Sequence, residues 1–385
     1  MLIGLGTEQK RNFSLVTIAN FFLFCNFSSF FLFPLYIKNL GGDEAAIGFI
    51  MGSFGITSLG FIPIVGGLID RYGRKRFMLF GAAVMMVASL SNLFINEIGY
   101  LIYLPRLMQG LGFAFFFTSA ATAASDFVPE ERLGEGLGIF GAFTIASYAV
   151  GPTVGEFVIG HLGYNAFFII SSSFSIVTLV LVSFLTDARM ERAHDPYGLD
   201  FFRVAFSRRF SGVFLTNLAL AGGFGAMLNF ISTYLKSKGF DVFYFFLIYS
   251  VTVMVIRVFG GRLSDAVDRR KVASPSLLFF SISIGAIALI NSLTSLVAVA
   301  FAFSLSYGLL YPVLTSIVID EALPNERGKV MAAFNATFSL GINFLAFGFG
   351  VVAKTFGFEL MYVVAGALAF MGYLIFTYLK AGERS

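Results

Sequence analysis

A short charged loop occurs twice in this chain, each time between two long apolar runs. The first copy, residues 66–76, reads GGLIDRYGRKR, and the second, residues 260–271, reads GGRLSDAVDRRK. An offset of 195 residues aligns three pairs of the two loops: Gly66 with Gly261, Asp70 with Asp265, and Arg74 with Arg269. A neighbouring offset of 197 aligns Asn20 with Asn217. The chain therefore consists of two related halves.

The apolar runs require the lipid bilayer as the solvent for most of the chain. Hydrophobic residues make up 57% of the 385 residues, and charged residues make up only 12%, against about 25% in soluble proteins. A membrane-crossing helix needs about 20 apolar residues, which predicts twelve spans. Internal repetition in such a membrane protein is typical of secondary transporters. The predicted spans are 13–36, 46–69, 77–96, 98–122, 135–160, 163–186, 210–235, 241–263, 273–292, 294–319, 328–353 and 357–379.

These spans predict two six-helix halves, residues 1–186 and 210–385, joined by the polar linker 187–209. With the N-terminus inside, 20 of the 26 Lys and Arg residues fall in inner loops and tails, and 4 fall in outer loops. Lys and Arg concentrate on the cytoplasmic side of membrane proteins. We therefore expect a multi-pass protein of the cytoplasmic (inner) membrane, with a cytoplasmic linker and both termini in the cytoplasm.

Several other classes of function lack their signatures. No G-x-x-x-x-G-K-[ST] phosphate loop is present, so ATP is not the expected energy source. The sequence shows no nucleophile constellation and no metal-ligand cluster, and it holds one cysteine and two histidines. Because its basic residues lie in short loops beside apolar runs, the positive charge indicates topology and not nucleic-acid binding. We expect no enzyme activity and no cofactor or metal.

Three motifs resemble those of the major facilitator superfamily. The pattern G-x-L-x-D-R-x-G-R-K-x at 66–76 is similar to the family's loop between its second and third helices. Residues 106–112, RLMQGLG, resemble the family's R-x-x-Q-G-x-G motif in its fourth helix. Residues 141–155 resemble the fifth-helix motif of the proton-antiporter branch, G-(x)n-G-P-x-x-G-G, but Glu156 stands where the family has a final glycine.

The resemblance implies an all-α membrane protein with two pseudo-symmetric six-helix bundles around a central cavity. It implies a secondary active transporter, and we expect proton-coupled export of small lipophilic or amphipathic compounds by alternating access. The expected partners are the bilayer, a small-molecule substrate and protons, and the expected state is a monomer. Two alternatives stay open: proton-linked or facilitated uptake of a sugar or organic acid, and a non-transporting receptor or lipid-handling protein.

The duplicated loop also predicts a conformational latch. By resemblance, Asp70 faces the start of the span 328–353, and Arg74 pairs with Asp126. The corresponding residues of the second half are Asp265, Arg269 and Asp320. The simpler interpretation is that the basic residues only anchor the topology. Close helix packing or gating is expected at small residues and a proline, namely Gly66, Gly67, Gly73, Gly151, Pro152 and Gly155.

Three ionisable residues, Arg106, Glu156 and Arg257, are predicted within the hydrocarbon, where such residues usually face a bundle interior or a water-filled cavity. Glu156 is the one acid among them and is the candidate proton carrier, with Arg106 as its candidate partner. Alternatively, Glu156 is solvated at the outer interface, and Arg257 extends to the cytoplasmic surface. The candidate substrate-cavity residues are Asn26, Arg106, Gln109, Tyr148, Asn229, Arg257, Tyr307, Tyr311 and Asn335.

Overall fold

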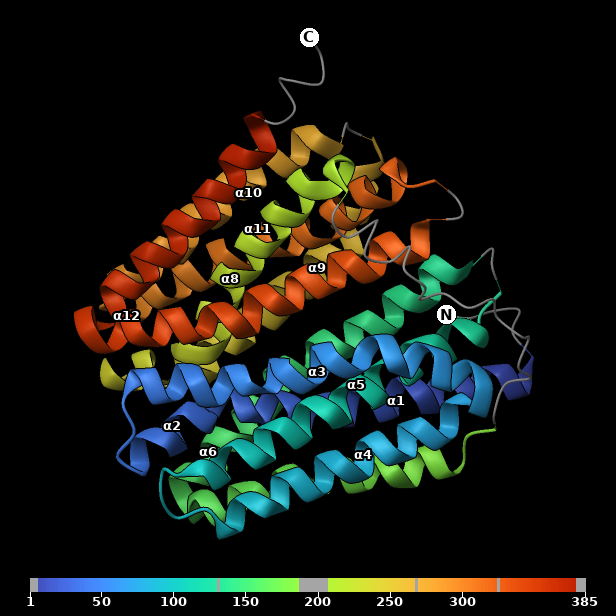
Figure 1. Ribbon diagram of the computed structural model, residues 1–385, viewed down its shortest axis with the longest axis horizontal. Coiled ribbons are helices and arrows are strands. Elements are labelled where there is room, and N and C mark those ends of the chain that lie inside the picture. The colour runs from blue at the N-terminus through green and yellow to red at the C-terminus, as the bar shows by residue number, and fades with distance from the viewer. Residues whose placement is uncertain (1–5, 130–131, 187–206, 267–268, 324–325, 379–385) are drawn as a thin grey trace. The chain divides into compact units, whose positions relative to one another are not determined.

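The structure is a computed structural model that describes residues 6–129, 132–186, 207–266, 269–323 and 326–378. Over these residues the chain is helical and forms no strand, as the sequence predicts (Figure 1). Short 3-10 turns extend several helices at Phe30–Leu32, Asn92–Phe94, Tyr100–Ile102 and Ile287–Leu289. The α-helices are α1 (Thr7–Ser29), α2 (Phe33–Asn39), α3 (Glu44–Tyr72), α4 (Arg74–Ser91), α5 (Tyr103–Asp126), α6 (Leu133–Ser183), α8 (Arg208–Ser237), α9 (Val242–Ala266), α10 (Arg269–Ala286), α11 (Leu293–Glu321) and α12 (Arg327–Tyr378).

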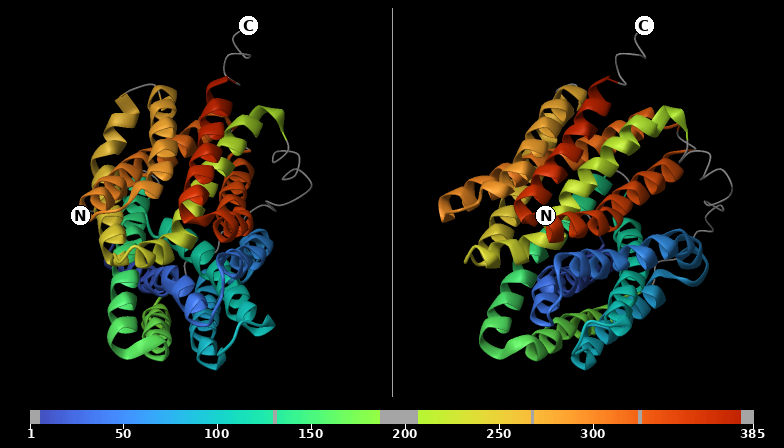
Figure 2. Two further views of the ribbon diagram at one scale, coloured as in Figure 1. Left: turned by 90° about the vertical axis from the view of Figure 1, so that its left-hand side faces the viewer. Right: turned by 60° about the vertical axis from the view of Figure 1, so that its left-hand side comes forward.

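Nine helical segments of the described chain are long and apolar enough to cross a membrane. Two of them, α6 and α12, have 51 and 52 residues, or about 77 Å at 1.5 Å per residue, far more than one crossing needs. Each bends at a glycine with positive φ, Gly163 at 80° and Gly357 at 90°. Counting each of these two as two spans, and the shorter apolar helix Val242–Arg257 as another, gives the predicted twelve. Figure 2 shows the bend of α6 in green at the lower edge.

The chain divides into two compact units. Unit 1 comprises Met1–Tyr36 and Ile56–Asp195, and unit 2 comprises Ile37–Gly55 and Pro196–Ser385. The segment 37–55, which the sequence alone assigns to the first half, therefore packs with unit 2. Most of the predicted linker, residues 187–206, lies outside the described residues.

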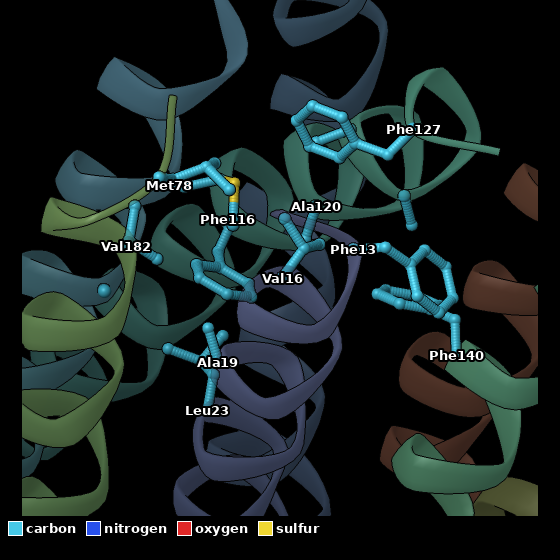
Figure 3. Close-up of a cluster of buried hydrophobic side chains, with 14 of the residues drawn as sticks. Phe13, Val16, Ala19, Leu23, Met78, Phe116, Ala120, Phe127, Phe140 and Val182 are labelled. Atoms are coloured by element: carbon cyan, nitrogen blue, oxygen red, sulfur yellow. The ribbon is translucent and has the colours of Figure 1, made fainter. Parts of the chain in front are cut away.

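Unit 1 is held together by an apolar cluster between α1, α4, α5 and α6 (Figure 3). Phe13 of α1, Met78 of α4 and Phe116 of α5 are each at most 1% exposed within it. Helices α4 and α5 approach closely because glycines face each other there. A Cβ on Gly112 would lie 2.8 Å from the Gly81 carbonyl oxygen, nearer than two such atoms approach. The last glycine of the R-x-x-Q-G-x-G motif therefore permits this contact.

In unit 2, α8 lies along α12, as Figure 2 shows in yellow-green and orange-red. The first turns of α3 also pack on α12, where a Cβ on Gly48 would lie 2.4 Å from the Ala346 carbonyl oxygen. Corresponding asparagines make corresponding contacts in the two units. The Asn20 amide donates to Thr144 Oγ1 at 2.8 Å, and the Asn217 amide donates to Thr337 Oγ1 at 2.9 Å. Both bonds join the first helix of a half to its fifth span.

Candidate functional site

The first candidate site is the charged turn between α3 and α4. Gly73 has a φ of 92°, a value that favours glycine, and it lets α4 begin one residue after α3 ends. Arg74, only 8% exposed, places its Nε 2.9 Å from Asp126 Oδ2 at the end of α5. Its Nη1 donates to the Ile69 carbonyl oxygen at 3.4 Å. The turn is thus tied to the ends of both α3 and α5.

Unit 2 repeats this arrangement at the start of α10. Arg269 forms an ion pair with Asp320, and Arg270 forms one with Glu321 at the end of α11. The side chains of Asp70 and Asp265 lie outside the described residues, so their part in a latch stays a prediction. Gly66 is partly buried, whereas a Cβ on Gly67 would meet no described atom within 4 Å. The packing expected at these two glycines therefore also stays a prediction.

The second candidate site is a buried cation in α5. Arg106 is 5% exposed and Gln109 is 1% exposed, and Arg106 Nη1 donates to Gln109 Oε1 at 2.7 Å. Three residues apart, the two side chains lie on the same face of the helix. In the same unit, Tyr148 of α6 lies among aromatic rings, with its ring centroid 5.2 Å from that of Phe31 and 6.3 Å from that of Phe24. Arg106 and Gln109 thus form a buried, hydrogen-bonded polar pair on α5.

Helix α6 contacts α1 around Pro152, which lies inside the helix. A Cβ on Gly151 would lie 2.1 Å from Ser28 Oγ and 2.6 Å from the Cys25 carbonyl oxygen. One on Gly155 would lie 2.9 Å from Leu32 Cδ1. These two glycines therefore permit the approach of α1. Glu156 is the next residue of α6 after Gly155, and its side chain is partly exposed.

The third candidate site joins α9, α11 and α12 in unit 2. Tyr311 donates its hydroxyl to Asn335 Oδ1 at 3.3 Å. About one turn before Tyr311, a Cβ on Gly308 would lie 3.3 Å from the Ile256 side chain of α9, so the next residue, Arg257, lies near this pair. Tyr307, one helical turn away from Tyr311, stacks on Phe224 of α8 with ring centroids 4.2 Å apart and planes 5° apart. The Arg257 guanidinium, the Tyr311 phenol and the Asn335 amide thus lie near the stacked rings of Tyr307 and Phe224.

Two of the predicted cavity asparagines make helix-to-helix hydrogen bonds instead of lying beside these clusters. Asn26 is fully buried, and its amide donates to Ser89 Oγ at 2.8 Å and to the Ser171 carbonyl oxygen at 2.6 Å. The Asn229 amide donates to the Ile342 carbonyl oxygen at 3.2 Å. Both amides therefore hold neighbouring helices together. A substrate role for them stays a prediction.

This arrangement of paired halves agrees with a known family. The profile described as Major Facilitator Superfamily matches residues 15–266 and 244–385. The chain belongs to the Major Facilitator Superfamily. It is thus a multi-pass integral membrane transporter, as the three sequence motifs predict. Within the described residues, an ion pair joins Arg74 to Asp126 in one half and Arg269 to Asp320 in the other.

Several proteins that are similar to this chain carry names that describe transport. The staphylopine export protein of Staphylococcus aureus is 25% identical over 90% of this chain and 90% of its own length. The multi-drug resistance efflux pump PmrA of Streptococcus pneumoniae is 25% identical over 86% of each chain. A crystal structure of the nucleoside transporter NupG superposes with a TM-score of 0.80 at 14% identity, covering 95% of this chain and 99% of that one. That similarity establishes the fold.

Sequence reasoning missed two features of this superfamily member. The first is the contact of α3 with α12 through Gly48, together with an ion pair at 2.7 Å between Lys354 and Asp43. The second is the stacking of Phe224 on Tyr307, because nothing in the sequence around Phe224 distinguishes it from the other phenylalanines among the 51 in the chain. Glycine spacing in α3 could have indicated the first, whereas no signal in the sequence indicated the second.

Proposed function

We propose that this transporter is a proton-coupled exporter of small lipophilic or amphipathic compounds and works by alternating access. Two relatives that align with most of the chain are named for export, one for staphylopine and one for multiple drugs. The helix-five motif, which resembles that of the proton-antiporter branch, supports the same direction. The proposed setting is the cytoplasmic membrane, with both termini on the cytoplasmic side, because Lys and Arg concentrate in the loops on that side.

The observation that carries the proposal is the burial of Arg106. A guanidinium in the membrane interior is costly and is usually retained for a function. A buried cation lowers the proton affinity of a nearby carboxyl group, and removal of that cation raises it again. If the distance between Arg106 and Glu156 changes between conformations, then Glu156 binds a proton in one state and releases it in the other. Glu156 is therefore the proposed proton carrier.

The ion pairs at the inner helix ends have a separate proposed role in conformational change. Arg74 pairs with Asp126 at the start of α4, and Arg269 pairs with Asp320 at the start of α10. We assign to these charged segments, together with Asp70 and Asp265, the latch that stabilises the outward-open state. A charge-assisted contact of about 1–3 kcal/mol changes the ratio of two conformations by roughly five- to a hundredfold. The latch therefore acts on the conformational equilibrium and not on the substrate.

Transport into proteoliposomes with an imposed pH gradient tests the proposal. The wild-type protein should move lipophilic compounds uphill in exchange for protons. Glu156→Gln should keep substrate exchange but lose accumulation driven by the gradient. The control is Glu135→Gln, which removes a carboxylate from the same helix where it pairs with Arg132 in the first turn. Normal uphill pumping by Glu156→Gln would place the proton carrier elsewhere. Substrate transport by the wild type that does not depend on the pH gradient would favour facilitated transport.

A further inference from the structure

Arg257 differs from the arginines of the two charged turns because no carboxylate among the described residues pairs with it. Its Nε is buried and has no hydrogen-bond partner within the described structure. In contrast, Arg74, Arg269 and Arg270 each have an acidic partner. Arg257 lies nine residues before the last residue of α9, or about 14 Å along the helix. An uncompensated charge at such a depth is unfavourable unless a ligand neutralises it.

The groups around Arg257 are mainly hydrogen-bond donors. Its guanidinium carries five N–H groups and accepts none. Asn335 is exposed and uses its Oδ1 to accept from Tyr311, so its amide N–H groups are free to donate within the described structure. The cluster contains no acidic side chain, and no group of acids that could hold a metal occurs among the described residues. Such a set of groups attracts an anion and repels a cation.

An aromatic surface adjoins this donor cluster. The rings of Tyr311 and Phe338 are partly exposed and lie edge to face with centroids 5.1 Å apart. Behind them, Tyr307 and Phe224 are 5% and 3% exposed, and their stacking holds the outer rings in place. An apolar ring of a ligand could therefore pack on Tyr311 and Phe338 while its charged group reaches Arg257.

We propose that Arg257, Tyr311 and Asn335 bind the anionic group of an amphipathic aromatic substrate, such as an aromatic carboxylate or sulfonate. The proposal rests on the proposed transport function, because it names the substrate class of that transporter. The ring of the substrate lies on Tyr311 and Phe338, and the guanidinium and the Asn335 amide bind the anionic oxygens. The phosphate of a lipid headgroup has the same charge and is the other source of such a ligand.

Binding of three naphthalene probes that differ in charge tests the proposal. The probes are 1-naphthoate, 1-naphthylmethanol and 1-naphthylmethylammonium, each measured at equilibrium with the purified full-length protein in detergent. We expect Arg257→Gln to weaken 1-naphthoate binding about ten- to a hundredfold and to change the binding of the other two less than about threefold. Tyr311→Phe keeps the ring and should weaken 1-naphthoate binding about three- to tenfold. The control is Arg209→Gln, which removes a charge that pairs with Glu326 at 3.7 Å, away from the cluster.

Thermal stability separates binding from a structural role. Because Arg257 has no acidic partner among the described residues, Arg257→Gln should melt at the same temperature as the wild type or higher. 1-Naphthoate should stabilise the wild type but not the variant. A lower melting temperature of Arg257→Gln, or equal loss of all three probes, would overturn the proposal in favour of a structural arginine.

Lipid nanodiscs distinguish the two sources of the anion. If the cluster binds a soluble substrate, the affinity of the wild type for 1-naphthoate should be equal in phosphatidylcholine and phosphatidylglycerol discs, measured at a salt concentration that screens the surface charge of the anionic lipid. Loss of 1-naphthoate binding in phosphatidylglycerol discs alone would assign the cluster to lipid and overturn the proposal. Transport is scored separately: a wild type that binds 1-naphthoate but moves no compound would contradict the proposed function and leave the anion site standing.

Discussion

Substitution of Gly151 by alanine should separate α1 from α6. The added Cβ would lie 2.1 Å from Ser28 Oγ, 2.6 Å from the Cys25 carbonyl oxygen and 2.9 Å from the Ser29 amide nitrogen. Two of these three atoms belong to the backbone of α1, so a change of side-chain rotamer cannot relieve the overlap. The helices must move apart, and this movement would also strain the 2.8 Å hydrogen bond from Ser28 Oγ to the Ser147 carbonyl oxygen.

Three contributions set the size of the effect. Overpacking costs about 1–3 kcal/mol, and a weakened buried hydrogen bond adds about 1 kcal/mol. The higher helix propensity of alanine offsets about 1 kcal/mol. The net loss is therefore about 2 kcal/mol, which corresponds to a roughly thirtyfold increase in the locally open population at 1.4 kcal/mol per factor of ten.

Cys25 provides the assay because it is the single cysteine of the chain and its side chain is fully buried on α1. A thiol-reactive dye should label it about thirty times faster in Gly151→Ala than in the wild type when opening is fast and reversible. The matched control is Gly160→Ala on the same helix. A Cβ there would meet nothing within 4 Å, so labelling should keep the wild-type rate. Wild-type labelling and an unchanged melting temperature in Gly151→Ala would refute the packing argument.

Two further predictions concern the ion pairs. Asp126→Asn should lower the free energy of unfolding by about 1–3 kcal/mol because it removes the carboxylate that faces the buried Arg74 charge. Asp320→Asn should cost less than about 1 kcal/mol because its ion pair is far more exposed. A thermal-unfolding comparison of the two variants that reverses this order would contradict the prediction. The hydrogen bond from Lys354 lowers the pKa of Asp43 below its ordinary value of 3.8, so this contact is complete above that value and is lost as pH falls through the lowered pKa. The difference in melting temperature between the wild type and Asp43→Asn should therefore stay constant from about pH 5 to 8 and disappear only below about pH 4, and a change near pH 6 would exclude Asp43 as its source.

The sequence by itself determined the membrane environment, the twelve spans and the two related halves. Hydropathy, turn glycines and loop charges are local properties, and each can be recognised within about 20 residues. The resemblance between motifs also predicts the pair of Arg74 and Asp126. These features depend on what a segment is and not on where its neighbours lie.

The tertiary structure alone decided which polar side chains are buried between helices and which are exposed. Asn26 and Asn335 look alike in the sequence, yet Asn26 is fully buried between helices, whereas Asn335 is exposed beside Tyr311. Likewise, nothing in the local sequence distinguishes Arg257, which has no acidic partner in the part of the chain that the structure describes, from Arg269, which pairs with Asp320. A hydrogen bond or an ion pair joins residues that are distant in the chain, so it depends on how separate helices approach one another.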